Sequence, residues 1–235
     1  MTVLWAVLRK ELLEALGDHH SLQGLLVQGG GVLITTGVLV PWLAARASLW
    51  LEAGAMVSLY VLFPAIFASF LAADAVAGEL ERGTLETLCA TPVSDGTLLF
   101  GKALAAVVLA VALSYFSQAL GLLIVNLHGH RPGLFLPPVH VLVATLGGAP
   151  TAALLTTALA LGVSCRVHVA RAAQQICLVV SMLLFFLGVE VVTRLRLPSG
   201  LAGVFLLEGV TLLAGAVTLI AVRARFRRER FFDRG

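Results

Sequence analysis

The side chains in this sequence that could do chemistry are few, and most of them interrupt apolar stretches. Glu190, Glu208 and Gln118 each stand inside such a stretch. If these stretches cross a bilayer, a polar group inside them is costly and becomes a candidate for a substrate pathway. Glu190 and Arg194 are also spaced i, i+4, which allows a local ion pair. For both carboxylates, a structural role is therefore the alternative to a place in a translocation path. For Gln118, the alternative is an interhelical hydrogen bond.

Three histidines form a second candidate group. His128, His130 and His140 surround the tripeptide Arg131-Pro-Gly. A His-x-His pair can bind a metal or the iron of haem. A solvated loop with incidental histidines is the simpler interpretation, so we predict no metal site.

The third candidate is a polar island, residues 79–92, which lies between two long apolar stretches. Gly83 can break the chain there, and Thr84 can then act as an N-cap. Glu86 would lie in the first turn, where the helix dipole favours an anion, and Leu88 would lie on an apolar face. The pattern predicts a short, rigid helix between two longer ones.

The composition places the chain in a membrane. Of the 235 residues, 59% are hydrophobic and only 12% are charged, whereas soluble domains are about a quarter charged. The net charge of +3 does not indicate a nucleic-acid partner, because the basic residues gather at the ends of apolar segments. The sequence contains no GxxxxGK[ST], HExxH or GxSxG motif, so it lacks the common ATPase, zinc-hydrolase and serine-hydrolase signals.

Six stretches are long and apolar enough to cross a bilayer, which needs about 20 such residues. We therefore predict an all-α membrane protein with six transmembrane helices, an N-terminal amphipathic interfacial helix and a short helix at 79–90. The predicted spans are 22–44, 53–75, 97–127, 138–163, 170–192 and 200–222.

Residues 3–16 predict the separate amphipathic helix. Leu4, Leu8 and Leu12 fall on one face at helical spacing, and Trp5 suits the headgroup region. The segment is too short to span, so we expect it to lie in the membrane interface.

The basic residues predict the orientation. Positively charged residues favour the cytoplasmic side of a membrane, and twelve of the 16 Lys and Arg residues fall on one side of the predicted topology. We therefore expect both termini in the cytoplasm and the chain in the plasma (inner) membrane. The twelve are Arg9, Lys10, Arg82, Lys102, Arg166, Arg171, Arg223, Arg225, Arg227, Arg228, Arg230 and Arg234.

The polar island also resembles a known family. The string Glu79-x-Glu-Arg-Gly-Thr-Leu-Glu-x-Leu-x-Ala-Thr-Pro-Val-Ser, followed by Leu99-x-Gly-Lys102, looks like the region after the second span of ABC-2 type transporter permeases. These are membrane subunits of ATP-binding-cassette exporters. The six-span architecture with an amphipathic N-terminal helix resembles the family over nearly the whole chain. The loop around 193–200 is shorter than the family's frequent extracellular insertion, and residues 190–200 could mark half-helices on the outer side.

The resemblance implies a function and partners. The short helix would be a coupling helix that docks into a groove on a separate ATPase subunit, present in two copies, which would bind ATP and Mg while this chain holds no cofactor. A second permease subunit would complete a homodimer or heterodimer. The implied coupling residues are Glu79, Glu81, Arg82, Gly83, Thr84, Glu86 and Leu88.

The sequence is compatible with two alternative functions. A haem exporter B-like subunit of cytochrome c maturation is a similarly small six-span permease, and His128 and His130 would then matter. An ATP-independent carrier or a membrane enzyme would need acid or base groups at membrane depth, for which Glu190 and Glu208 are the available pair.

Overall fold

A computed structural model describes residues 2–17, 27, 29–47, 53–81, 83, 94–128, 133–167, 169–195 and 201–225. All regular structure in these residues is helical, which confirms the all-α class. The helices are α1 (Thr2–Gly17), η1 (Leu33–Leu39), α3 (Val40–Ala47), α4 (Ala53–Ala73), η3 (Asp74–Gly78), α5 (Glu79–Glu81), α7 (Asp95–His128), α8 (Val139–Ser164), α9 (Ala170–Leu195) and α10 (Leu201–Arg225).

Five helices in the described part of the chain are long and apolar enough to cross a membrane. The helix over Gly29–Ala45 is apolar but shorter, so the count of six spans stays a prediction. The second predicted span does not end near residue 75. It continues through the π-helical turn η3 and α5 as far as Glu81. The helix α9 is unbroken to Leu195, so no half-helix begins between residues 190 and 195.

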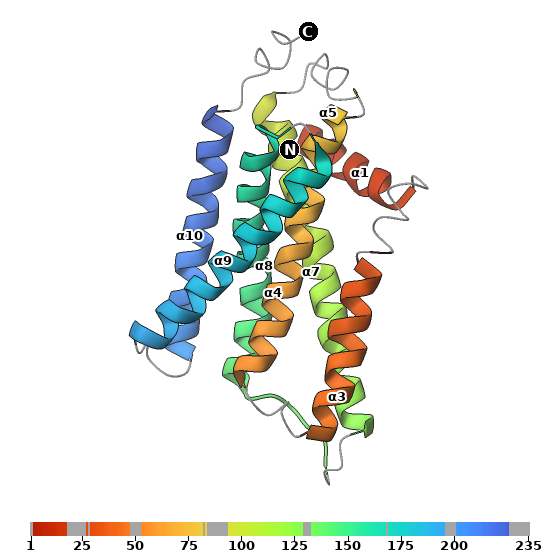
Figure 1. Ribbon diagram of the computed structural model, residues 1–235, viewed down its shortest axis with the longest axis vertical. Coiled ribbons are helices and arrows are strands. Elements are labelled where there is room, and N and C mark those ends of the chain that lie inside the picture. Colours follow the sequence, from red (N-terminus) through yellow and green to blue (C-terminus); the bar gives the residue numbers. More distant parts are fainter. Residues whose placement is uncertain are drawn as a thin grey trace.

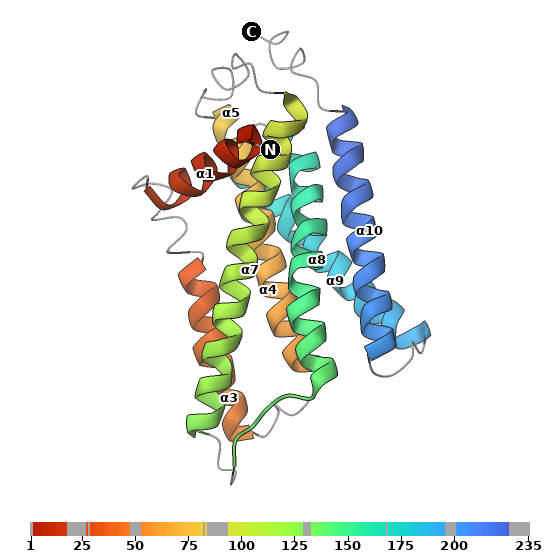
Figure 2. The ribbon, with the colours of Figure 1, turned by 180° about the vertical axis from the view of Figure 1, so that it is seen from behind.

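The helices α4, α7 and α8 form the centre of a bundle (Figures 1 and 2). The helix α10 packs along α8, while η1 and α3 pack along one half of α7. The helix α9 crosses the bundle obliquely, and α1 lies across one end of it against α7. That end also holds α5, the start of α7 and the last turn of α10 (Figure 1).

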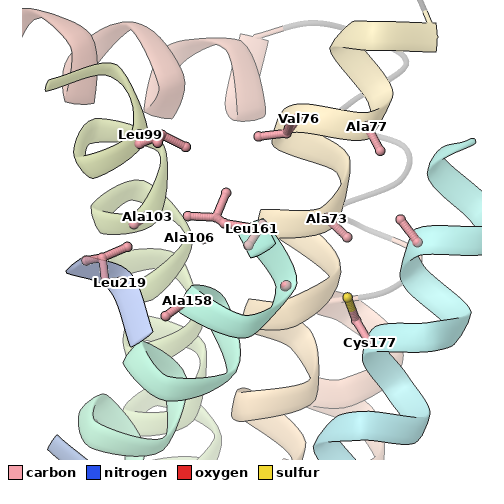
Figure 3. Packing of buried hydrophobic residues seen from close by; sticks show 13 residues of the cluster. Ala73, Val76, Ala77, Leu99, Ala103, Ala106, Ala158, Leu161, Cys177 and Leu219 are labelled. Atoms are coloured by element: carbon pink, nitrogen blue, oxygen red, sulfur yellow. The ribbon is translucent and has the colours of Figure 1, made fainter. Parts of the chain in front are cut away.

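Small side chains dominate the largest buried cluster, where α4, η3, α7, α8, α9 and α10 meet (Figure 3). Ala73, Ala103 and Ala158 are buried there beside Leu161. In a bilayer, small residues let helices approach closely, so that van der Waals contact holds them together. Gly215 extends this packing to α10, because a Cβ there would lie 3.1 Å from the backbone nitrogen of Leu155 in α8.

Two prolines interrupt the central helices. Pro64 lies inside α4 and has no N–H to donate to the carbonyl oxygen of Tyr60, four residues earlier. In a bilayer such an oxygen must find another donor, since no water is available. The hydroxyl of Ser114 in α7 donates to it at 2.8 Å.

The carbonyl oxygen that the second proline leaves without a donor also accepts a hydrogen bond from a side chain of α7. Pro150 lies inside α8 and leaves the carbonyl oxygen of Leu146 without its helical donor. The hydroxyl of Tyr115 donates to that oxygen at 2.6 Å. Neighbouring side chains of α7 therefore repair both proline breaks.

The repair predicts a double-mutant result. Removing the hydroxyl with Tyr115→Phe should destabilise the protein by about 1–3 kcal/mol, because the Leu146 carbonyl is left without its donor. In a Pro150→Ala background the restored N–H should take that oxygen, and the cost of Tyr115→Phe should nearly vanish. Thermal unfolding of the purified protein in detergent measures both values. Equal costs in the two backgrounds would contradict the repair.

Candidate functional site

The helix that begins at Ala53 ends at the start of the polar island. Its last helical residue is Glu81, and Gly83 takes the left-handed conformation with φ of 70°. The N–H of Gly83 donates to the carbonyl oxygen of Leu80 at 3.2 Å. Glycine adopts this conformation without steric cost and commonly closes a helix in this way. The break predicted at Gly83 is therefore present.

A buried ion pair lies at the base of the island. The side chain of Lys102 in α7 is fully buried, and its Nζ donates to Oε1 of Glu79 in α5 at 2.7 Å. The same ammonium donates to Oε1 of Glu11 in α1 at 2.9 Å. One lysine thus joins three elements that are far apart in the sequence.

The charges alternate along this cluster. Nζ of Lys10 lies 3.8 Å from Oε1 of Glu11. A second cation therefore lies next to Glu11, on the solvent-exposed side of the cluster. Burying a charge is tolerated when good geometry and opposite charges compensate its lost hydration. The alternation of Lys10, Glu11, Lys102 and Glu79 provides that compensation, and removing a buried member would leave its partner uncompensated.

Each named residue of the string Leu99-x-Gly-Lys102 makes a packing contact or an ion pair at this end of the bundle. Leu99 is buried in the alanine-rich core. The helix α1 packs closely on α7 at Gly101, because a Cβ there would lie 3.2 Å from the Cβ of Val7 in α1. Lys102 then reaches the carboxylate of Glu11 on the same short helix.

Glu11 was not singled out by the sequence analysis. It lies three residues after Leu8, which is buried in the structure, and so belongs beside the apolar face of α1. A charge at that position, with a lysine inside a predicted span, was the available signal. Its partner could not be identified without the packing of α1 on α7.

The second carboxylate of the island anchors another helix. Oε2 of Glu81 accepts a hydrogen bond from the backbone N–H of Ala170 at 3.1 Å. Ala170 is the first residue of α9, where free N–H groups and the helix dipole favour an anion. Of the other predicted coupling residues, Arg82, Thr84, Glu86 and Leu88 lie outside the described residues.

The helix that follows the island, α7, is capped at its start by Ser94. The hydroxyl of Ser94 accepts the N–H of Thr97 at 3.2 Å, at the start of α7. This satisfies one of the free donors of the first turn.

The candidates for a translocation path lie deeper in the bundle. The amide of Gln118 in α7 donates to the hydroxyl of Thr145 in α8 at 2.7 Å, so it makes the interhelical hydrogen bond named as its alternative. The carboxylate of Glu208 in α10 lies against Gly147 of α8. Glu190 is part of α9, and its side chain lies outside the described part of the structure.

The histidines are described only in part. His128 ends α7 and His140 lies in the first turn of α8, both exposed, while His130 lies outside the described residues. Among the residues that the structure describes, no three His, Cys, Asp or Glu side chains form a group that could hold a metal ion.

Comparison with known proteins adds two findings. The family model for ABC-2 family transporter proteins matches residues 9–198. The chain is also 32% identical over 133 residues to a protein from Pseudomonas aeruginosa described as "Probable ABC transporter permease protein NosY". That alignment covers 52% of this chain and 46% of the relative, so the chain spans about half the length of the curated relative it matches.

The ion cluster predicts unequal effects of one substitution at two lysines. Lys102→Met should destabilise the protein by about 3–5 kcal/mol, because two largely buried carboxylates lose their shared cation. Adding Glu79→Gln should recover part of that loss. Lys10→Met removes a cation from the same Glu11, but from a side chain that is 41% exposed, and should cost at most about 1 kcal/mol. Unfolding in detergent measures all three, and similar losses at both lysines would contradict the buried cluster.

Proposed function

The chain belongs to the ABC-2 family of transporter proteins, and we propose that it is the permease subunit of an ATP-binding-cassette exporter. The family and the apolar helices make it a multi-pass membrane protein and a transmembrane transporter subunit. The direction of transport, the separate ATPase subunit and the coupling role of the island are the further content of the proposal.

One observation carries the coupling role. Glu79 is the first residue of the island and Lys102 follows its last residue, and their ion pair closes the island at its base. A force on the island therefore acts on α5 and α7 together. Glu11 extends the connection to α1, and Glu81 extends it to the start of α9. Rigid connections of this kind can pass on a small displacement, whereas a flexible loop would absorb it.

These connections support the following coupling step. Two copies of an ATPase subunit bind ATP and Mg and close around them, and residues 79–90 follow the groove in which they are seated. The clamped ends of the island then move the helices that carry the candidate path residues Gln118, Glu190 and Glu208. The cargo leaves the cytoplasm or the inner leaflet along the interface with a second permease subunit, identical or homologous to this one.

The arrangement of the termini supports the orientation in this proposal. The helix α1, the helix α5, the start of α7 and the last turn of α10 lie at one end of the bundle (Figure 1). Most of the basic residues fall at that end of the predicted topology, as positively charged residues do on a cytoplasmic face. We assign this end to the cytoplasm and the protein to the plasma (inner) membrane.

The island itself gives the direct test of partnership. A triple variant with Glu81→Gln, Arg82→Ala and Glu86→Ala should no longer retain the ATPase subunit on purification and should lose ATP-dependent export. The glutamine keeps an oxygen acceptor for the N–H of Ala170, so the start of α9 stays capped. Gly209→Ala, where a Cβ would meet nothing within 4 Å, is the matched control. If complex formation and export both survive in the triple variant, the coupling assignment is wrong.

A second variant separates binding of the ATPase from transmission. Glu79→Gln leaves Lys102 paired with Glu11 but weakens the clamp at the base of the island. We expect the ATPase subunit to bind normally, while the amount exported per ATP hydrolysed falls several-fold. Parallel measurement of hydrolysis and export in proteoliposomes tests this. An unchanged ratio would mean that the clamp has no part in transmission.

A further inference from the structure

Glu208 lies in the candidate membrane span formed by α10, on the side that faces α8. It lies on the same face as Gly215 and Leu219, seven and eleven residues further on, both of which are buried. It is the eighth residue of α10, so at 1.5 Å per residue it lies about 10 Å from the start of the helix. This depth is within the hydrocarbon core of the predicted span.

The carboxylate of Glu208 lies directly against Gly147 of α8, where there is no side chain to displace it. A Cβ added to Gly147 of α8 would lie 2.6 Å from Cδ of Glu208. Even alanine would therefore displace the carboxylate from the surface of α8. Gly209, the next residue of α10, has open space at the same position.

The carboxylate has no partner within the described residues. Its Oε1 is buried without a hydrogen-bond donor, and no ion pair in the described part of the chain includes Glu208. An ionised carboxylate in that condition is strongly disfavoured in a bilayer. The group must therefore carry a proton or meet a cation from outside the chain.

The surroundings select the kind of cation. The neighbouring oxygen atoms of α8 are already engaged, since Leu146 accepts the Tyr115 hydroxyl and Gly147 accepts the Thr151 hydroxyl. A bare Ca²⁺ or Mg²⁺ ion needs about six or more oxygen ligands, which the described residues around the carboxylate do not offer. An ammonium group brings N–H donors that one carboxylate can accept. The adjacent side chains Phe205 and Leu212 are exposed and apolar, and so favour a cation with an apolar body.

We propose that Glu208, seated on Gly147, is the binding group for an amphiphilic ammonium ion that enters from the bilayer. The ammonium donates hydrogen bonds to the carboxylate, and its hydrocarbon part lies against the apolar face of α10. That such a molecule is the cargo rests on the proposed function. Binding itself does not.

The test measures binding without the ATPase subunit. The full chain is placed in nanodiscs of phosphatidylcholine, which has no N–H donor, and titrated with radiolabelled dodecylamine. We expect a saturable component above partition into protein-free nanodiscs. An infrared difference spectrum should lose the band of a protonated carboxyl group and gain that of a carboxylate. Dodecyltrimethylammonium has the same charge and chain but no N–H, and should bind about tenfold more weakly.

Two variants and a matched control locate the site. Glu208→Gln should weaken dodecylamine binding at least about tenfold and abolish the infrared change. Gly147→Ala should have a similar effect on binding because it displaces the carboxylate, whereas Gly209→Ala should leave binding unchanged. Circular dichroism after reconstitution identifies any variant that has not folded. Such a variant is replaced by Glu208→Asp, whose shorter side chain should also weaken binding.

The outcomes distinguish a lipid from an added amine as the source of the ammonium group. They also distinguish failure of the ammonium site from failure of the exporter assignment. Occupancy by phosphatidylethanolamine alone, seen as competition with dodecylamine, supports the site and identifies a lipid as its ligand. No saturable binding, or equal binding of the two amphiphiles, overturns the ammonium site. Neither result affects the exporter assignment, which depends on the island. Failure of the island variants would likewise leave the binding site standing.

Discussion

One end of the bundle, here called the charged end, holds α1, α5 and the start of α7. Its arrangement depends on the ion pair between Lys102 and Glu79. It joins the helix that enters the polar island to the helix that leaves it. Because the ammonium is completely buried, it cannot exchange its partners for water, and its two carboxylates must stay close. One side chain therefore holds both α1 and α5 to α7.

The middle of the bundle depends on a different constraint. Each carbonyl oxygen at membrane depth needs a donor from the protein, and the prolines of α4 and α8 each remove one. Ser114 and Tyr115 replace the missing donors, while Ser117 shares a hydrogen bond with Thr36 of η1. The segment 114–118 of α7 thereby joins η1, α4 and α8. This polar segment keeps broken helices in place where an apolar one would leave carbonyl groups unsatisfied.

The regular parts of this architecture could be predicted from the sequence. Long apolar runs define helices by themselves, and local signals such as Gly83 and the Ser94 cap depend on neighbouring residues alone. The contacts between distant residues could not be derived in that way. Nothing in the chain near Lys102 indicates that Glu11 would meet it from 91 residues away. The extension of the second helix to Glu81 was missed for a similar reason, since burial of Glu79 depends on that lysine.

The two constraints meet in α7, which makes this helix the route between the charged end and the membrane interior. Lys102 holds its first turns to the base of the island, and Tyr115 contacts α8 thirteen residues later. At 1.5 Å per residue, that separation is about 20 Å. A helix held at both points transmits a tilt or a shift along its axis, because the intervening turns are packed and hydrogen-bonded. Movement of the island would therefore reach the proline break of α8, and Gly147 with the carboxylate of Glu208 lies next to that break. A change at the charged end could then alter the seat of the carboxylate without any contact between the two sites.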